Sequence, residues 1–221
     1  MESDKKKAPM LVGLCGRSGS GKGYVSEKFA EIGIPSIDTD AVYRKLTAPA
    51  DEMSPCMKEL VEKFGAEVAK DDNSLDRAKM RSLVFGNDRG ALDELNRITH
   101  KYILFETEKI AAELQDNGND IVLIDAPVLY ESGFDRSCAA VIAVTAPEEK
   151  IIERIMRRDG VTSEDAKARL STQKPVSELT DRADFVIVND GDDDRLDEVI
   201  RECADTLRKM QKEKNSKEKQ R

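Results

Sequence analysis

The chain has 221 residues, of which 39% are hydrophobic and 36% are charged, and its formal net charge at pH 7 is −8. This length suits one sizeable core, and no apolar run approaches the roughly 18 residues that a membrane helix needs. The negative charge excludes general attraction to nucleic acid, although a local arginine cluster can still capture an anionic substrate. We therefore expect no nucleic acid partner, no membrane partner and, as the favoured state, a monomer.

The N-terminal segment, MESDKKKAPM, has neither the hydrophobic region nor the small-residue cleavage site of a secretory signal. We therefore expect a cytoplasmic location. The four cysteines form no Cys-x-x-Cys pair, and the chain has one histidine, His100, so no cluster of metal ligands is recognisable. We expect reduced, packed thiols at Cys15, Cys56, Cys138 and Cys203.

The first predicted elements are a buried strand, a loop and a helix. Residues 10–15, MLVGLC, form a short apolar run that ends in glycine-rich sequence. Such a run is typical of a fully buried strand that leads into a loop. Apolar residues then recur at helical spacing over 24–32, and a short strand-like stretch, IPSIDTD, follows at 34–40.

The middle of the chain, from about 53 to 116, predicts helices and no convincing strand. Ser54 followed by Pro55 is typical of an N-cap and a first helical turn, and Gly65 of the end of that helix. Three further apolar faces predict three more helices, around residues 80–84, 92–98 and 103–114. We interpret this segment as a helical insertion between strands of a sheet.

The last part of the chain returns to strands. Three more apolar runs predict buried strands, over residues 121–125, 140–144 and 184–188. Helical patterns lie between the strands, so a parallel α/β sheet is predicted. An amphipathic helix is predicted at 196–207, whereas the final stretch, KMQKEKNSKEKQR, has almost nothing to bury and is expected to lack stable structure.

A glycine-rich loop follows the first strand. Residues 16–22, GRSGSGK, match the G-x-x-x-x-G-K part of the P-loop in its required context, after a buried strand and before a helix. Glycines let backbone N–H groups turn around a phosphate, the helix N-terminus adds positive potential, and Lys22 reaches the β- and γ-phosphates. ATP or a related nucleotide is therefore expected. The residues predicted to bind it here are Gly16, Ser18, Gly19, Ser20, Gly21, Lys22, Gly23 and Tyr24.

Gly23 departs from the motif, because a serine or threonine at that position normally offers its hydroxyl to Mg²⁺. Mg²⁺ keeps several waters and needs one or two carboxylates besides the substrate phosphates, so a water could take the missing position. We favour a working loop with altered metal coordination. The alternative is a nucleotide-binding regulatory protein without turnover.

Carboxylates follow two of the predicted strands. Asp38 and Asp40 come at the carboxyl end of the second strand, where a carboxylate could accept a proton from an acceptor hydroxyl or hold Mg²⁺ through water. The alternative is structural, since Asp40 could cap the helix that follows. Asp125 ends its strand like a Walker-B acid, or else as an ordinary turn residue.

Arginines gather late in the chain. Arg154, Arg157 and Arg158 lie on one predicted helix, and Arg169 lies on the next. Two such helices can form a lid whose arginines neutralise charge on a transferred phosphoryl group and exclude water. The alternative is a solvated face paired with nearby acidic side chains.

Six stretches of the sequence, taken in order, resemble the dephospho-CoA kinase family of P-loop small-molecule kinases. They are LVGLCGRSGSGK, GIPSIDTDAVYRKLTAP, LDRAKMRSLVF, VLIDAPVLYESG, ERIMRRDGVTSEDAKARLSTQ and ADFVIVNDG. The resemblance implies an α/β fold, in which a P-loop kinase core with a parallel sheet flanked by helices carries a helical acceptor-binding insertion, at about 53–116, and a small helical lid, at about 150–175. It implies one kinase domain over 10–208, between an N-terminal tail (1–9) and a charged C-terminal tail (209–221).

The resemblance also implies a reaction, the transfer of the γ-phosphoryl group of ATP to the ribose 3′-hydroxyl of dephospho-CoA, with Mg²⁺ as cofactor. It implies catalytic roles for Asp40 as the base and for Lys22, Arg154 and Arg158. By motif, the acceptor-binding residues are Asp38, Arg44, Arg77, Arg81, His100, Asp125 and Glu131. The turn that contacts adenine is implied at Asn189 and Gly191.

The sequence departs from the family pattern at three positions. Gly23 replaces a serine or threonine, and Arg17 stands where a glycine is common, so that it reaches toward substrate or points to solvent. Lys101 follows His100 where proline is usual, which leaves a buried structural role open for His100. Another small-molecule kinase of the same fold, such as a nucleoside or nucleoside-monophosphate kinase, is the alternative function within this class.

Overall fold

The computed structural model describes residues 8–86 and 90–219. The chain divides into two compact units, of which the first comprises Met1–Ile37 with Ala111–Arg221 and the second Asp38–Ile110. The expected tails lie partly outside the described residues, at 1–7 and 220–221.

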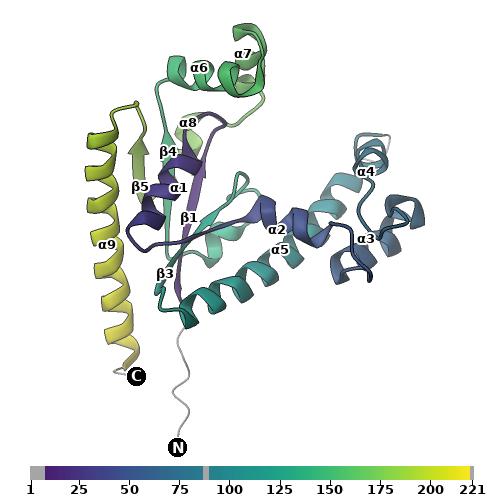
Figure 1. Cartoon of the computed structure of the whole chain (residues 1–221), viewed down its shortest axis with the longest axis horizontal. Coiled ribbons are helices and arrows are strands. Elements are labelled where there is room, and N and C mark those ends of the chain that lie inside the picture. Colours follow the sequence, from purple (N-terminus) through teal and green to yellow (C-terminus); the bar gives the residue numbers. More distant parts are fainter. Residues whose placement is uncertain (1–7, 87–89, 220–221) are drawn as a thin grey trace, which may run out of the picture. The chain divides into compact units, whose positions relative to one another are not determined.

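The first unit is built on a five-stranded parallel sheet with the strand order β2-β3-β1-β4-β5 (Figure 1). The strands are β1 (Met10–Gly16), β2 (Ser36–Asp38), β3 (Ile121–Asp125), β4 (Ala140–Thr145) and β5 (Phe185–Val188). The five predicted strands are thus confirmed. Because β1, at the centre, is parallel to both β3 and β4, their carboxyl ends share one edge, the edge at which such sheets bind ligands.

Helices cover both faces of this sheet. They are α1 (Lys22–Glu31), α8 (Val176–Thr180) and α9 (Asp193–Lys219), together with the short 3₁₀ helix η2 (Phe134–Ser137). Two further helices, α6 (Glu148–Asp159) and α7 (Ser163–Ser171), pack on each other around a small core of their own. Alternate β1 side chains face opposite ways. Val12 and Leu14 enter the core shared with α1 and α9, whereas Gly13 faces Leu129 and Cys138 on the other side.

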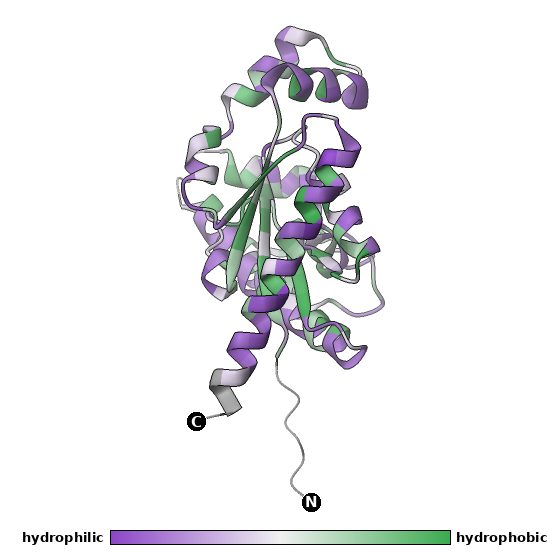
Figure 2. Cartoon of the chain, turned by 90° about the vertical axis from the view of Figure 1, so that its left-hand side faces the viewer, coloured by the Kyte–Doolittle hydropathy of each residue, from purple (hydrophilic) through white to green (hydrophobic). Residues whose placement is uncertain are grey.

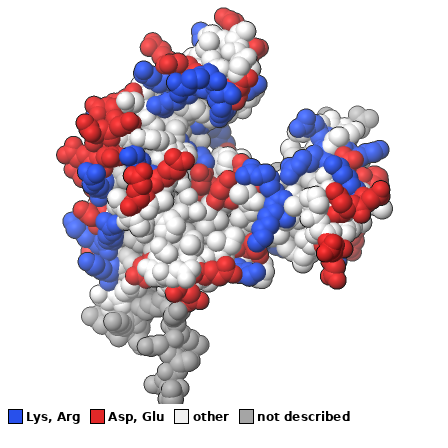
Figure 3. Space-filling view, in the orientation of Figure 1, with Lys and Arg blue, Asp and Glu red and all other residues white. Residues whose placement is uncertain are grey.

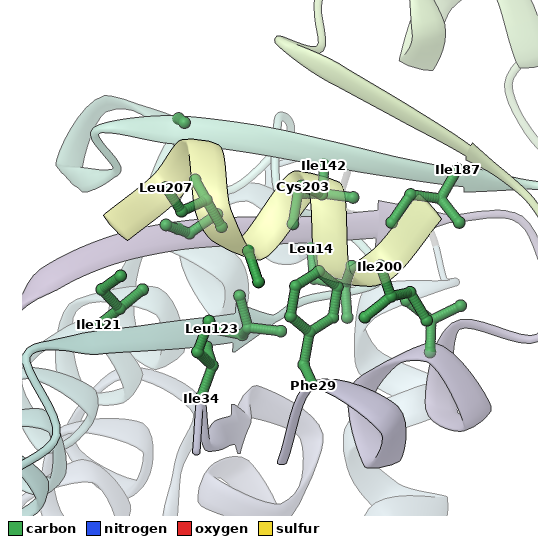
Figure 4. Packing of buried hydrophobic residues seen from close by; sticks show 14 of the residues in the cluster. Leu14, Phe29, Ile34, Ile121, Leu123, Ile142, Ile187, Ile200, Cys203 and Leu207 are labelled. Carbon is green, nitrogen blue, oxygen red and sulfur yellow. The ribbon is translucent and has the colours of Figure 1, made fainter. Parts of the chain in front are cut away.

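The main core lies between the sheet and the two helices α1 and α9. Phe29 of α1 and Ile200, Cys203 and Leu207 of α9 meet Leu14 and other strand residues there (Figure 4). In Figure 2 the strands are hydrophobic and the outer side of α9 is hydrophilic. Burial of this apolar surface is the main force that holds the sheet and its helices together.

The C-terminal helix is longer than the sequence predicted. The expectation that residues from 209 onward lack stable structure is wrong, because α9 continues to Lys219. Met210 packs against the main core and Gln211 is buried, so the last turns still have contacts to make. Lysine, glutamate and glutamine are also good helix formers.

The second unit is helical around its own core. It contains α2 (Thr39–Leu46), α3 (Pro55–Phe64), the short 3₁₀ helix η1 (Ala66–Val68), α4 (Arg77–Val84) and most of α5 (Ala91–Asp116). Ser54 caps α3 by accepting the N–H of Met57 at 3.1 Å, and Gly65 ends it, as the sequence predicted. This unit begins at Asp38, earlier than the position near 53 that the sequence indicated.

The two helices predicted at 92–98 and 103–114 are one helix, α5, which is a correction. The intervening residues, THKY at 99–102, include neither glycine nor proline, so nothing breaks the backbone hydrogen bonds. Thr99 adds a bond by donating its hydroxyl to the carbonyl of Leu95 at 2.8 Å. None of the helices in the described part of the chain has both the length and the apolar character that a membrane span requires.

Candidate active site

The phosphate loop lies between β1 and α1, at the carboxyl edge of the sheet. Gly19 and Gly21 have φ angles of 80° and 88°, in the left-handed region that favours glycine. The helix α1 begins at Lys22, and no side chain caps its N-terminus. Its first N–H groups are therefore available to an anion, which the positive end of the helix also favours.

Glycine is required in this loop for close packing as well as for backbone conformation. A Cβ at Gly16 would lie 2.6 Å from the carbonyl oxygen of Val144. A Cβ at Gly21 would collide with the side-chain amide of Asn189, and one at Gly19 would lie 2.9 Å from the carbonyl oxygen of Ile151 on α6. The loop is thus enclosed by β4, α6 and the turn after β5.

Lys22 and Asp125 form an ion pair at the edge of the sheet. The ammonium group donates to the carboxylate, and both side chains are largely buried, with exposed fractions of 17% and 13%. Asp125 ends β3, the neighbour of β1, so the parallel pairing brings it to the phosphate loop. This location agrees with the Walker-B-like reading of Asp125.

Arg154, on α6, contacts the phosphate loop and the turn after β5. Its guanidinium donates to the carbonyl oxygens of Gly19 (3.4 Å) and Ser20 (3.3 Å). It also donates to Asn189, at the carbonyl oxygen (3.2 Å) and at Oδ1 (2.8 Å). Each of these four hydrogen bonds of Arg154 therefore ends on an oxygen atom of the protein itself.

Arg158, one turn further along α6, is exposed. It donates to Ser18 Oγ at 3.1 Å and to the carboxylate of Asp159, which Arg169 of α7 also contacts at 2.5 Å. Figure 3 shows lysine and arginine side chains gathered over α6 and α7. The helix pair therefore presents positive charge close to the phosphate loop.

Two contacts that the sequence did not predict join the loop to α7 and to the residues that follow it. Arg17 donates to the carbonyl oxygen of Leu170, so it does not simply point to solvent. The backbone N–H of Ser18 donates to Gln173 Oε1 at 3.0 Å. Gln173 stands in the family-like stretch SEDAKARLSTQ, but nothing in the sequence pattern indicated its partner.

The remaining predicted nucleotide-binding residues differ in their surroundings. A Cβ built at Gly23 would meet no atom within 4 Å, so this position is open. Tyr24 is 38% exposed, and the ammonium nitrogen of Lys28 lies 5.6 Å from the centroid of the Tyr24 ring. Asn189 is buried, and Gly191 has a φ of 95° in the turn that follows β5.

In the second unit, Asp38 and Asp40 have different roles. Asp38 is the N-cap of α2, because its carboxylate accepts the N–H groups of Asp40 (2.8 Å) and Ala41 (3.1 Å). The alternative that Asp40 is the cap is therefore wrong. Asp40 is exposed in the first turn of α2, and Asp38 also accepts a hydrogen bond from Arg44 at 3.2 Å.

The other predicted acceptor residues are dispersed. Arg77 lies over the ring of Tyr43, 5.3 Å from its centroid, and donates to Thr47 Oγ1 at 3.3 Å. Arg81 is exposed on α4, and His100 is half-buried on α5, where burial lowers its pKa below the usual 6.5. These residues share the second unit with Asp38, Asp40 and Arg44. In the first unit, Glu131 pairs with Lys174 at 3.2 Å.

The cysteines are free thiols, three of them buried and Cys138 half-buried, as the sequence led us to expect. Cys15 immediately precedes the phosphate loop, and burial raises its pKa to about 11, although a hydrogen bond from Tyr130 acts the other way. Burial likewise raises the pKa of Cys56 to about 11 and those of Cys138 and Cys203 to about 12.

No cluster of three or more potential metal ligands occurs within residues 8–86 and 90–219. Mg²⁺ is nevertheless compatible with the site, because it needs one or two carboxylates and takes its remaining oxygens from substrate phosphates and water. Asp125 supplies a carboxylate beside Lys22, and the open space at Gly23 can admit a water where a hydroxyl is usual.

Comparison with known proteins gives the family. The sequence model of the dephospho-CoA kinase family matches residues 10–194. The chain belongs to this family. It is 34% identical to the dephospho-CoA kinase of Lactobacillus johnsonii over 200 residues, which is 90% of this chain and 98% of that protein.

Two solved structures share the fold, and the second of them is named a dephospho-CoA kinase. TT1252 from Thermus thermophilus is 27% identical and superposes with a TM-score of 0.70, over 92% of this chain and 98% of that one. The dephospho-CoA kinase from Campylobacter jejuni is 25% identical with a TM-score of 0.62, over 89% and 96% of the two chains. The α/β kinase fold that the resemblance implied is thus confirmed.

Proposed function

We propose that this protein transfers the γ-phosphoryl group of ATP to the ribose 3′-hydroxyl of dephospho-CoA, the last step of coenzyme A biosynthesis. The observation that carries the proposal is the phosphate loop. Its glycines with left-handed backbone conformation lead into the N-terminus of α1, which no side chain caps and which begins at Lys22. That loop belongs to a chain of the dephospho-CoA kinase family. As a member of this enzyme family, the protein is expected in the cytoplasm and as a monomer.

The loop and Lys22 bind the donor in this proposal. The N–H groups at the start of α1 donate hydrogen bonds to the β-phosphate, and Lys22 contacts the β- and γ-phosphates after exchanging Asp125 for phosphate oxygen. Asn189 and Gly191 contact the adenine, because they form the turn that closes over Gly21. Tyr24 lies in the first turn of α1, and because it contacts Lys28 it is the least certain of the predicted nucleotide contacts.

Asp40 is the proposed base. It is exposed in the first turn of α2, where its backbone N–H donates to the carboxylate of Asp38. In the transfer step, the 3′-hydroxyl gives its proton to Asp40, its oxygen bonds to the γ-phosphorus, and the bond to the bridging oxygen of ADP breaks. Arg44, Arg77, Arg81 and His100, in the same unit, and Glu131 in the other unit are the proposed acceptor contacts.

Mg²⁺ would be held by Asp125, with waters and phosphate oxygens as its other ligands, and with Asp38 and Asp40 as further candidates through water. When bound, it would offset negative charge on the β- and γ-phosphates. Arg158, the exposed arginine nearest to the loop hydroxyl of Ser18, stabilises charge on the transferring group. Positioning and electrostatics carry most of the rate enhancement in such transfers.

The test is mass spectrometry of the product after incubation of the purified protein with Mg-ATP and dephospho-CoA. We expect a product heavier by one phosphoryl group, and fragmentation should place that group on the ribose 3′-oxygen. Lys22→Ala should abolish the product, whereas Arg136→Gln, at an exposed position of η2, should leave it unchanged.

Two outcomes would replace the proposal. Product formation with a nucleoside or nucleoside monophosphate, and none with dephospho-CoA, would assign a different small-molecule kinase. ATP binding without any phosphorylated product at saturating dephospho-CoA would assign a regulatory protein that does not turn over.

A further inference from the structure

We propose that Arg154 is a positioning residue of the phosphate loop, which it holds in its anion-binding conformation, and that it does not act on the transferring phosphoryl group. The resemblance to the family implied a catalytic role for this arginine. Its hydrogen bonds in the structure lead to a different role, because each of them ends on an oxygen atom of the loop or of Asn189.

The first argument is the geometry of the peptide groups. In a trans peptide the carbonyl and the N–H of one group point in opposite directions. The carbonyl of Ser20 and the N–H of Gly21 belong to one peptide group. By binding that carbonyl at 3.3 Å, Arg154 keeps the N–H of Gly21 pointing the other way, toward the N-terminus of α1.

The carbonyl of Gly19 is held in the same manner, at 3.4 Å, and shares its peptide group with the N–H of Ser20. That N–H donates within the loop to the carbonyl of Arg17 at 3.1 Å, which closes a turn. A hydrogen bond to a charged donor polarises the carbonyl and strengthens the N–H at the other end of the group. One guanidinium thus fixes two consecutive peptide groups.

The second argument is the link from Arg154 to the turn after β5. Asn189 is buried, and it accepts from Arg154 through its carbonyl oxygen and through Oδ1. The backbone N–H of Asn189 donates in turn to the carbonyl of Thr145 at the end of β4, at 2.8 Å. Arg154 therefore ties the loop to the sheet through a fixed residue.

The third argument is that these contacts need the planar guanidinium group of arginine, whose N–H donors have fixed relative positions. Arginine presents several N–H groups in a rigid arrangement, whereas lysine is a compact point charge. A group that only neutralises phosphate charge would tolerate lysine better than one that bridges three residues. Arg154→Lys, which keeps the charge and most of the side chain, therefore separates the two roles and is less prone to disturb folding than Arg154→Gln.

The experiment combines two measurements on Arg154→Lys and Arg154→Gln. The first is amide hydrogen exchange of residues 16–23 in the full-length protein without ligand. The second is calorimetric affinity for ADP, which lacks the transferred group. We expect faster exchange in the loop and about tenfold weaker ADP binding in both variants, as for loss of hydrogen bonds to a charged group.

Arg136 supplies the control. It lies on η2 in the same unit, is exposed, and its side chain makes no hydrogen bond or ion pair among residues 8–86 and 90–219, so Arg136→Gln should change neither measurement. The proposal is overturned if the Arg154 variants keep wild-type loop exchange and ADP affinity while kcat falls, because Arg154 would then act on the transferring group itself. Only the ADP measurement rests on the proposed function, and failure of the wild-type protein to bind ADP would count against that function instead.

Discussion

The ammonium group of Lys22 is paired with the carboxylate of Asp125 across the neighbouring strands β1 and β3. This pair keeps two opposite charges largely buried at the edge where the phosphates are expected. A nucleotide that uses Lys22 must compete with Asp125 for it. Under the proposed function, the displaced carboxylate would then be available to Mg²⁺, so the arrival of the nucleotide would free a metal ligand.

Replacement of Asp125 by asparagine should therefore affect binding and turnover in opposite directions. Without the competing anion, we expect ADP to bind about threefold to tenfold more tightly in the absence of Mg²⁺. We expect kcat with Mg-ATP to fall by about tenfold to hundredfold, because a carboxylate ligand is lost. Calorimetry and a coupled assay measure the two effects.

The control for this charge change is Asp120→Asn, at the residue that immediately precedes β3. This variant should alter neither ADP affinity nor kcat. If Asp125→Asn bound metal-free ADP no better than the wild type does, competition between Asp125 and the nucleotide for Lys22 would be ruled out.

The aspartates at the start of α2 should separate activity from stability. Asp40→Asn should lower kcat by about 10²-fold to 10⁴-fold, as for loss of a general base, with little change in Tm. Asp38→Ala removes the N-cap of α2 and should cost about 0.5–2 kcal/mol of unfolding free energy. Turnover assays and thermal denaturation of both variants test this, and full activity of Asp40→Asn would remove Asp40 as the base.

The open space at Gly23 allows the missing hydroxyl to be restored. Gly23→Ser should fit without a clash and should reduce the Mg²⁺ concentration that gives half-maximal activity, because the hydroxyl adds a direct ligand. Gly23→Ala adds the same Cβ without the oxygen and is the matched control. An equal Mg²⁺ requirement in the two variants would show that the metal does not approach this position.

His100 should make stability depend on pH in a predictable direction. Burial lowers its pKa in the folded protein, so the unfolded chain binds the proton more readily near its ordinary pKa of 6.5. Stability rises with pH wherever the unfolded state binds more protons. The unfolding free energy should therefore fall as pH is lowered from about 7.5 through 6.5, the ordinary histidine pKa.

This pH effect can be assigned, because the chain has one histidine. Urea denaturation of the wild type and of His100→Gln at pH 7.5 and about 5.5 measures the change in unfolding free energy. Both pH values lie above the ordinary pKa values of carboxylates, so these groups contribute little to the change. The wild type should lose more stability than the variant, and identical losses would contradict the prediction.

The sheet and the phosphate loop were predictable because their signals are local. Each strand is an apolar run within one short stretch, and the motif from Gly16 to Lys22 carries its own spacing and context. The extent of α5 and α9 was missed for the opposite reason. Apolar periodicity weakens around His100 and after Leu207, but helix-forming residues and a few distant contacts keep the backbone helical.

The contacts around the loop were beyond the reach of sequence patterns. Arg154 meets Ser20 across 134 positions of the chain, and Ser18 meets Gln173 across 155. The sequence identified Arg154 by motif, but a motif gives a residue type without its hydrogen-bond partner. For Arg17 neither sequence alternative named this partner, because the carbonyl that it binds lies on α7.

The buried thiols can report when each part of the protein unfolds. A thiol reagent attacks the thiolate, and the raised pKa values of Cys15, Cys56, Cys138 and Cys203 leave almost none at neutral pH in the folded state. Labelling must then await local or global unfolding. Because Cys56 belongs to the second unit and the other three to the first, mass spectrometry of the labelled cysteines would time the opening of each unit separately, with no residue replaced.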